Sequence, residues 1–267
     1  MTQDGAARVQ LENELRLALA RRELAVHFQP QVALANRRIA GVEALVRWPH
    51  RLGGWVPPAE FIPIAEDSSL IHPVGEYVLA RACRQIGEWD GAGLPRIRVA
   101  VNVSARQFRR DGFVRAIEGA LRLAALEPER LELEFTEGTL AESPDQALAV
   151  LKKLKDIGVQ LAVNDFGVGY SNPRHLSRMP IDRLKIDRSF VQRVTERGQE
   201  AGIAQAIIAL GHARGLRVVA VGVETVEQLA VLLSHGCDEA QGELFCGPLP
   251  AHALAPLLAT GVVSGSG

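Results

Sequence analysis

Short apolar runs end in amide or carboxylate residues at four points of the chain. The run from Val159 to Val163 is too short for a helix core and ends at Asn164 and Asp165, which lead into a glycine-rich loop. Three further runs of this kind carry Glu43, Asn102, and Glu134 with Glu137. Oxygen atoms that converge from the ends of several parallel strands are what a hard divalent cation requires. The sequence therefore predicts a site built from oxygen ligands at the ends of buried strands.

The elements that must position these residues alternate along most of the chain. Two opening strand-like runs, 24–33 and 38–48, have too short a connection for a crossover helix and are expected to be antiparallel. Further strand-like runs lie at 96–104, 130–137, 158–166, 182–187, 216–224 and 239–245. Helical patterns lie at 57–68, 74–89, 111–125, 144–157, 199–214 and 226–235. This alternation predicts an α/β fold with a mainly parallel sheet and helices outside it. An open doubly wound sheet would alternate in the same way, but one central mouth explains the polar strand ends better, so we expect a TIM-type barrel.

Residue parity within the strands indicates which face of each strand is interior. The odd positions from Ile97 to Val103 are all apolar and β-branched, whereas Arg98 and Asn102 lie on the other face. The apolar face should meet the helices and the polar face the barrel interior. Arg98 and Glu132 would then lie deep inside the barrel, where we predict a structural ion pair.

Length and composition are those of one barrel domain. The chain has 267 residues, 47% of them hydrophobic, and one α/β barrel uses ~250 residues. We expect a single domain over 1–267, with an N-terminal helix within 1–23 that could continue from an upstream signalling domain, and a flexible tail at 260–267. The three cysteines lack metal-site spacing, and no chemistry is assigned to them.

The charge balance excludes some classes of partner. Thirty basic and 31 acidic residues give a net charge of -1, so no global field attracts polymeric nucleic acid or an anionic membrane. A small anionic ligand held by local charges is still compatible with this balance. No signal peptide and no run of ~20 apolar residues is apparent, so we expect no membrane insertion and a cytoplasmic location.

Nine short motifs, in order and spacing, resemble the EAL domain family over nearly the whole chain. They are FQPQV at 28–32, EALVRW at 43–48, FIPIAE at 61–66, NVSARQF at 102–108, LEFTE at 133–137, NDFGVGYS at 164–171, KIDRSFV at 185–191, GVET at 222–225 and QGELF at 241–245. The resemblance implies a modified α/β barrel with one antiparallel strand. It also implies hydrolysis of cyclic di-GMP to the linear dinucleotide with two Mg²⁺ or Mn²⁺ ions.

The resemblance also implies roles for individual residues. The residues that resemble metal ligands are Glu43, Asn102 and Glu134 for the first ion, with Asn164 at the bridging position and Asp165 at the second ion. Those that resemble contacts to the dinucleotide are Gln29, Glu43, Leu45, Arg47 and Asp165. Lys185 resembles the lysine that orients the attacking water, Gln241 a glutamine near that water, and Glu137 the anchor of the loop after Asp165.

Three motifs depart from the family pattern. Asn164 replaces the first aspartate of the usual Asp-Asp-Phe-Gly, and Val221 replaces the glutamate of the usual Ala-Glu-Gly-Val-Glu-Thr. Glu224 is not expected to substitute for that glutamate, because residues three apart on a strand point to opposite faces. Ser171-Asn172-Pro173 replaces the usual Ser-Ser-Leu in the loop that couples the site to a dimer interface.

Both acidic losses fall on the side of the second ion. An amide oxygen can bind one cation, but it lacks the charge with which a carboxylate bridges two. We therefore expect one Mg²⁺ or Mn²⁺ site, with the second weak or absent, in an impaired receptor for cyclic di-GMP. The alternatives are an active phosphodiesterase and a protein-interaction module without ligand; an enolase-type barrel fits the opening Gln-Pro poorly. A homodimer and an upstream sensor or GGDEF-type domain are left open.

Overall fold

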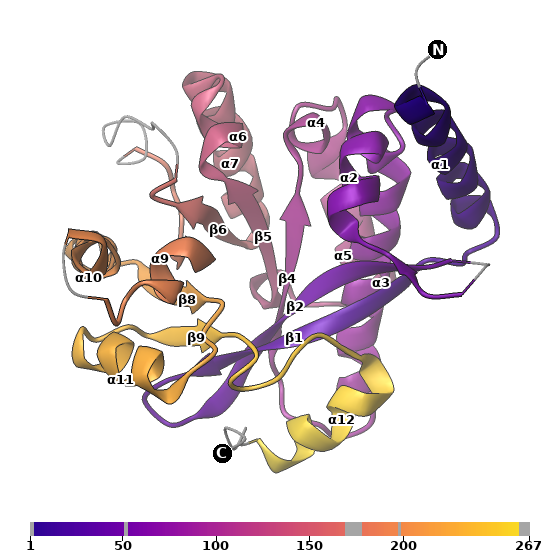
Figure 1. Cartoon of the computed structure of the whole chain (residues 1–267). Helices are drawn as coiled ribbons and strands as arrows, with labels where there is room; N and C mark the ends of the chain where they lie inside the picture. Colours follow the sequence, from indigo (N-terminus) through magenta and orange to yellow (C-terminus); the bar gives the residue numbers. More distant parts are fainter. Residues whose placement is uncertain (1–2, 51–52, 169–177, 197–198, 262–267) are drawn as a thin grey trace.

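Eight strands close into a barrel within the part of the chain that the computed structural model describes, residues 3–50, 53–168, 178–196 and 199–261 (Figure 1). Around the barrel the order is β1, β2, β4, β5, β6, β7, β8 and β9, and β9 returns to β1. β1 is antiparallel to both of its barrel neighbours, and the other barrel strands pair in parallel. The predicted TIM-type barrel with one antiparallel strand is therefore confirmed.

The strands are β1 Ala25–Ala33, β2 Arg38–Pro49, β3 Trp55–Val56, β4 Arg98–Val103, β5 Leu131–Thr136, β6 Gln160–Phe166, β7 Arg183–Ile186, β8 Arg217–Val221, β9 Glu239–Gln241 and β10 Leu249–Pro250. The short strand β3 pairs with the end of β2, and the short strand β10 pairs with β1; neither belongs to the eight strands of the barrel. The helices are α1 Gln3–Ala20, α2 Pro58–Asp67, α3 Ile71–Gly91, α4 Ala105–Phe108, α5 Phe113–Ala124, α6 Glu137–Ala141, α7 Pro144–Ile157, α9 Arg188–Gln192, α10 Gln199–Ala213, α11 Val226–Ser234 and α12 Ala251–Thr260, with a 3₁₀ turn at Pro128–Arg130.

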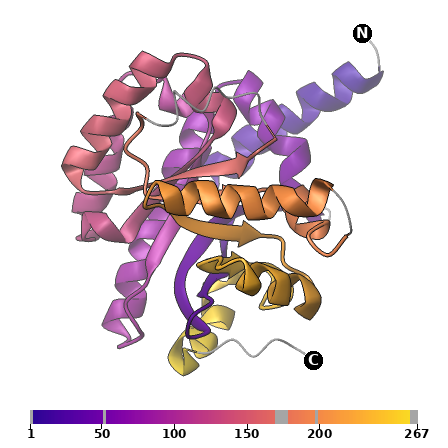
Figure 2. The same ribbon diagram turned by 90° about the vertical axis from the view of Figure 1, so that its left-hand side faces the viewer.

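The helices cover the outside of the barrel. α1 packs on α2 beside the barrel, and α12 lies beneath the ribbon formed by β1 and β2 (Figure 1). α10 crosses the opposite side, with α11 next to it (Figure 2). In the described residues no helix is both long enough and apolar enough to cross a bilayer.

The alternation of side chains along the strands separates an apolar outer core from a polar interior. Val99, Val101 and Val103 are buried under the helices, as their β-branched parity predicts. Arg98 lies on the opposite face and crosses the barrel in front of Gly41, where a Cβ atom would come within 2.6 Å of the Arg98 side chain. Glycine is therefore required at position 41 to admit the arginine.

A layer of charged side chains fills the barrel on the side away from the candidate site. Arg98 Nε lies 3.3 Å from a Glu132 carboxylate oxygen, which confirms the predicted pair, and Arg98 also pairs with Glu239. Arg183 approaches Glu132 at 2.7 Å. The Glu132 carboxylate is fully buried. Two cations and two anions thus neutralise one another inside the barrel, as buried charges require.

Some boundaries differ from the sequence-based expectations. α1 ends at Ala20 rather than near residue 23, because the chain turns at Arg21 and Arg22, and Arg22 has a left-handed φ of 58°. β8 ends at Val221, three residues earlier than expected, and β9 is much shorter than the expected run. Helix α12 is absent from the sequence-based expectations and includes Thr260, which they assign to the tail; residues 262–267 lie outside the described residues.

Candidate functional site at the barrel mouth

The strand ends bring six of the sequence-predicted site residues to one end of the barrel. They are Glu43 on β2, Asn102 on β4, Glu134 on β5, Asn164 on β6, Lys185 on β7 and Gln241 on β9. In-register pairing places Asn102 beside Glu134, and Thr136 beside Asn164. Alternation along each strand turns these side chains toward the interior.

Lys185 is the centre of this group. Its ammonium lies 2.5 Å from a Glu134 oxygen and 3.0 Å from a Glu43 oxygen. All three side chains are buried, with Lys185 only 1% exposed. Burial of an amine is tolerated here because two carboxylates surround it. The lysine is therefore held as an internal counter-ion between one carboxylate from β2 and one from β5.

Two amides complete the arrangement. Asn102 donates to Glu43 at 2.6 Å. Asn164 donates to Glu134 at 2.7 Å and to the Asn102 oxygen at 2.8 Å. The Oδ1 atom of Asn164 is buried and has no hydrogen-bond partner among the described residues. A buried amide oxygen without a donor is an open acceptor that suits a cation or an incoming donor.

A row of glutamines links the site to β1. Gln241 donates to Gln29 at 2.8 Å and to Glu43 at 2.7 Å. Gln31 is fully buried, lies 3.3 Å from the Gln241 oxygen, and accepts from Arg98 at 2.7 Å. Sequence analysis missed Gln31, although its position two residues after Gln29 places both on the same face of β1. Gln31 thus connects the charged layer to the mouth.

The pKa values of the three buried groups depend on the placement of two carboxylates around one ammonium. Burial, reinforced by the nearby Glu43 charge, raises the pKa of Glu134 to about 7. For Glu43, burial acts upward, but Lys185 and the amide donors outweigh it and lower the pKa. Burial opposes the charge of Lys185, yet Glu134 and Glu43 raise its pKa. Glu134 therefore holds its proton to a higher pH than a free carboxyl does, and near neutral pH its protonated and ionised forms are both present.

Asp165 lies apart from this cluster. The β6–β7 pairing is irregular between Val163 and Phe166, and Asp165 has a left-handed φ of 53°. Its side chain is exposed and has no hydrogen-bond or ion-pair partner among the described residues. Partial burial, with Asp187 nearby, raises its pKa. A bulge of this kind re-aims a side chain at the rim of a barrel.

Glu137 reaches the backbone that follows this bulge. Its carboxylate accepts from the Gly167 amide at 3.4 Å, and the side chain is buried. The predicted coupling loop with Ser171-Asn172-Pro173 lies outside the described residues.

Val221 is the last residue of β8 and lies opposite Gln241 in the pairing with β9. Its neighbour in the chain, Gly222, has φ +81°, so the strand does not continue to Glu224. Glu224 therefore lies outside the strand, so the expectation that it belongs to the same strand as Val221 is wrong. Glu224 instead forms an exposed ion pair with Arg188.

A cavity of about 320 Å³ opens beside the cluster. Asn102 and Glu134 form part of its polar wall, and apolar side chains of α2 and α3 form the other wall. Leu45 and Arg47 also line it. Arg47 is half-buried, burial lowers its pKa, and within the described ranges no carboxylate forms an ion pair with it. This cavity therefore offers an unpaired guanidinium next to an apolar wall.

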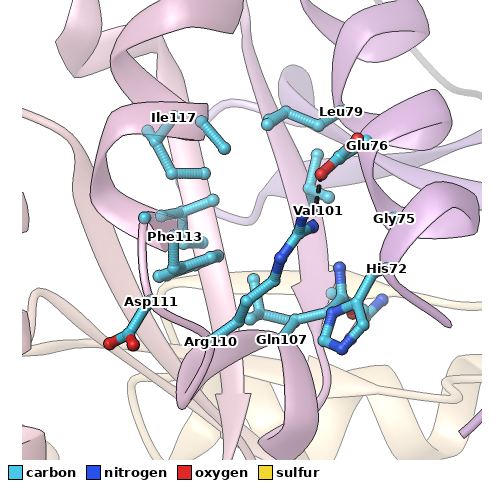
Figure 3. Close-up of a pocket in the computed structure, with 15 residues that line it drawn as sticks. His72, Gly75, Glu76, Leu79, Val101, Gln107, Arg110, Asp111, Phe113 and Ile117 are labelled. Atoms are coloured by element: carbon cyan, nitrogen blue, oxygen red, sulfur yellow. Dashed lines mark hydrogen bonds and ion pairs between the residues drawn. The ribbon is translucent and has the colours of Figure 1, made fainter. Parts of the chain in front are cut away.

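A second, smaller cavity of about 190 Å³ lies on the outer side of β4 (Figure 3). The Arg110–Glu76 ion pair spans its opening. The Gln107 side chain packs on Gly75 and separates this cavity from the mouth, since a Cβ at position 75 would come within 1.7 Å of it. Its arginine and glutamate pair with each other and its remaining walls are mainly apolar.

The donor set is of the kind that a hard cation accepts. Glu43, Glu134 and the two asparagine oxygens supply carboxylate and amide ligands of the type that Mg²⁺ and Mn²⁺ accept. The described residues contain no cluster of three or more His, Cys, Asp or Glu side chains arranged to hold a metal.

Fold and mouth together define a class of protein, the α/β barrels that gather oxygen ligands and a buried lysine at the carboxyl ends of their strands. Residues 12–248 match the model of one family in this class, the EAL domain. The chain belongs to the EAL domain family.

Curated relatives agree with this assignment. The chain is 42% identical over 254 residues to the bifunctional diguanylate cyclase/cyclic di-GMP phosphodiesterase MucR of Pseudomonas aeruginosa, covering 95% of this chain and 37% of that protein. It is 44% identical over 250 residues to the cyclic di-GMP phosphodiesterase NbdA of the same organism, covering 94% of this chain and 32% of that protein. The chain thus spans about a third of the length of these relatives.

Solved structures agree as well. The c-di-GMP complex of the PaMucR phosphodiesterase superposes with a TM-score of 0.89 at 43% identity, covering 92% of this chain and 99% of that one. The FimX EAL domain from Pseudomonas aeruginosa bound to c-di-GMP superposes with a TM-score of 0.81 at 25% identity, covering 91% and 96%.

Proposed function

We propose that this chain is a cyclic di-GMP-binding EAL domain with impaired hydrolysis, and that it acts as a receptor or regulatory module. Relatives that are 42% and 44% identical carry the name cyclic di-GMP phosphodiesterase, and a structure 43% identical is a complex with this dinucleotide. The mouth cavity of this chain combines an apolar wall, which suits a base, with the unpaired Arg47, which suits a phosphate.

One observation carries the proposal of impaired hydrolysis. Asn164 uses its amide nitrogen to donate to Glu134 and Asn102, and Val221 ends β8 with an apolar side chain. A second ion at this side of the mouth would lack both a bridging carboxylate and a further acidic ligand. Hydrolysis of a phosphodiester by two ions depends on a clamp that both ions form.

A single Mg²⁺ or Mn²⁺ would be held by Glu43, Asn102 and Glu134, with the open Asn164 oxygen as a further ligand. Such an ion supplies Lewis-acid polarisation of a phosphate oxygen. Among the chain's own groups, Gln29 and Gln241 would lie beside the ligand, and Lys185 fixes the carboxylates of Glu43 and Glu134 by donating to both.

Two alternative functions, an active phosphodiesterase and a module without ligand, can be separated from the proposed receptor by one binding assay and one turnover assay. An active phosphodiesterase is favoured by the names of the relatives, and a module without ligand by the loss of acidic residues. Calorimetric titration with cyclic di-GMP and a turnover assay in Mn²⁺ separate the three. We expect saturable binding with turnover far below ~1 s⁻¹, the lower end of usual enzyme rates.

Metal binding should be limited to one ion and should weaken as the pH falls. The pKa of Glu134 is about 7, so below that pH a cation must displace a proton from its carboxylate. Affinity for Mn²⁺ should fall by up to about tenfold per pH unit below 7 and level off above it. Calorimetry at pH 6 and pH 8 should find a stoichiometry close to one Mn²⁺ per chain. In buffers of different ionisation enthalpy, binding should release protons at pH 6 but not at pH 8. Two tightly bound ions would contradict the proposal.

Arg47→Ala should weaken binding of cyclic di-GMP by roughly 10- to 100-fold, the value of a charge-assisted hydrogen bond. The melting temperature should hardly change, because Arg47 is half-buried and, among the described residues, its guanidinium donates only to the adjacent Val46 carbonyl. Arg47→Lys should restore part of the affinity. The matched control is Arg96→Ala, an exposed arginine paired with Glu127. Equal affinities for Arg47→Ala and the control would remove Arg47 from the site.

The remaining expectations stay proposals. They are a single domain over 1–267, a cytoplasmic location, a homodimer and an upstream sensor or GGDEF-type domain. The lengths of the relatives are compatible with further domains, since the chain matches about a third of each.

A further inference from the structure

Trp55 is an exposed indole at the edge of the mouth. The chain contains three tryptophans; Trp48 and Trp89 are 2% and 4% exposed, whereas Trp55 is 54% exposed. Trp55 lies on the two-residue strand β3, opposite Pro49 at the end of β2. Its exposure leaves a large aromatic surface available for contact with a ligand.

The indole packs against one ring that faces the site. The Trp55 and His27 ring centroids are 5.4 Å apart and the planes meet at 71°, an edge-to-face contact. His27 Nδ1 lies 3.3 Å from the Pro248 carbonyl oxygen, which fixes the imidazole. An edge-to-face pair leaves one ring face open for a further aromatic partner.

Strand geometry connects this pair to the mouth. His27 precedes Gln29 by two residues on β1, so both side chains lie on the same face, and His27 pairs with Leu45 across the ribbon. Two residues along a strand cover about 6.6 Å. The Trp55–His27 pair therefore lies beyond the Gln29–Gln241 contact, on the side of β2 that carries Leu45 and Arg47.

The charges near the pair favour an anionic ligand. Arg47 and His252 both act electrostatically on His27, and within the described residues Arg47 has no carboxylate in ion-pair contact. A ligand with an aromatic base and a phosphate satisfies the indole and the guanidinium together.

We propose that Trp55 and His27 form a stacking platform for one purine base of the cyclic dinucleotide, while Arg47 binds the adjacent phosphate. This inference rests on the proposed function and adds to it the residues that receive a base outside the mouth cavity. Stacking on an aromatic side chain contributes ~1–3 kcal/mol per base. The competing role for Trp55 is that it merely shields the β1–β2 ribbon.

Tryptophan fluorescence and calorimetry test the platform on the full chain with cyclic di-GMP. Saturating ligand should change the emission of the starting protein, and Trp55→Phe should lose that change, because the other two tryptophans are buried. Trp55→Ala should raise the calorimetric Kd by roughly 5- to 150-fold, the fold-change equivalent to 1–3 kcal/mol. Trp55→Phe should lie between the two, since it keeps an aromatic face.

Leu123→Ala is the matched control, because Leu123 is 90% exposed on α5, away from the mouth. It should bind as the starting protein does. A Trp55→Ala variant with unchanged Kd, or a starting protein whose emission is unchanged at saturation, would overturn the platform while leaving the proposed function intact. A starting protein that gives no binding heat and no emission change overturns both.

Discussion

The double variant Asn164→Asp/Val221→Glu is expected to hydrolyse cyclic di-GMP in Mn²⁺ about 10²- to 10⁴-fold faster than the starting chain, the range attributed to one general base. Each single variant should gain far less, because either alone leaves the second ion without one of its carboxylates. The two effects should therefore be strongly non-additive, and the double variant should exceed the product of the singles.

The geometry of the site supports this expectation. Asn164 lies in hydrogen-bond contact with Glu134 and Asn102, so an aspartate there would place a carboxylate oxygen where the proposed ions would bind. Position 221 is half-buried at the end of β8 and lies opposite Gln241. A glutamate at this strand end is long enough to reach solvent or an ion.

The same variant should show a stability that depends on metal. Without metal, an aspartate at position 164 would remove the amide donor to Glu134 and place two carboxylates in contact, which lowers the free energy of unfolding. Added Mn²⁺ should restore it, because an ion that binds only the folded state stabilises that state. Melting temperatures with Mn²⁺ and with a chelator, measured beside the turnover rates, test this linkage.

Two outcomes would contradict the argument. If Val221 faces a dry, repacked pocket, the glutamate becomes an unpaired buried charge that lowers stability and gives no rate. If the starting chain already hydrolyses cyclic di-GMP at ~1 s⁻¹ or more, its turnover lies in the usual range of enzymes, and the receptor proposal fails.

The barrel could be predicted because its strands obey simple rules. Apolar β-branched residues at every odd position from Ile97 to Val103 fix which face meets the helices, and the structure agrees. Short elements were harder. β3 and β10 have two residues each, too few for any pattern, and α12 contains Pro256, which weakens its helical signal. The early end of β8 depends on the left-handed Gly222, which a run of apolar residues does not reveal.

The sequence indicated which residues lie at the mouth, but not which of them contact one another. Their position at strand ends predicted that Glu43, Asn102 and Glu134 meet at one mouth, because carboxyl ends of parallel strands share one edge. That Lys185 lies between Glu43 and Glu134 depends on the diameter of the closed barrel, which no local pattern encodes. Gln31 was missed for the same reason, since its partners come from β4 and β9.

Arg98→Met is expected to lower the free energy of unfolding by about 3–5 kcal/mol, the cost of removing one partner from a buried ion pair. Arg98 is 8% exposed and pairs with Glu132 and Glu239, which are 0% and 1% exposed. The substitution leaves Arg183 as the single buried arginine beside two carboxylates, so one negative charge loses its counter-ion. For a chain of this size the melting temperature should fall by roughly 6–20 °C.

Arg217→Met is the matched control, because Arg217 approaches the same Glu239 carboxylate at 3.8 Å but is 61% exposed. Its loss should change the free energy of unfolding by no more than about 1 kcal/mol, as for other solvent-screened pairs. Adding Glu239→Gln to Arg98→Met removes the uncompensated charge and should recover part of the lost stability. Chemical denaturation of the four proteins compares these values. Equal losses for Arg98→Met and Arg217→Met would mean that the charged layer is hydrated rather than buried, and that solvent instead of the two arginines balances its carboxylates.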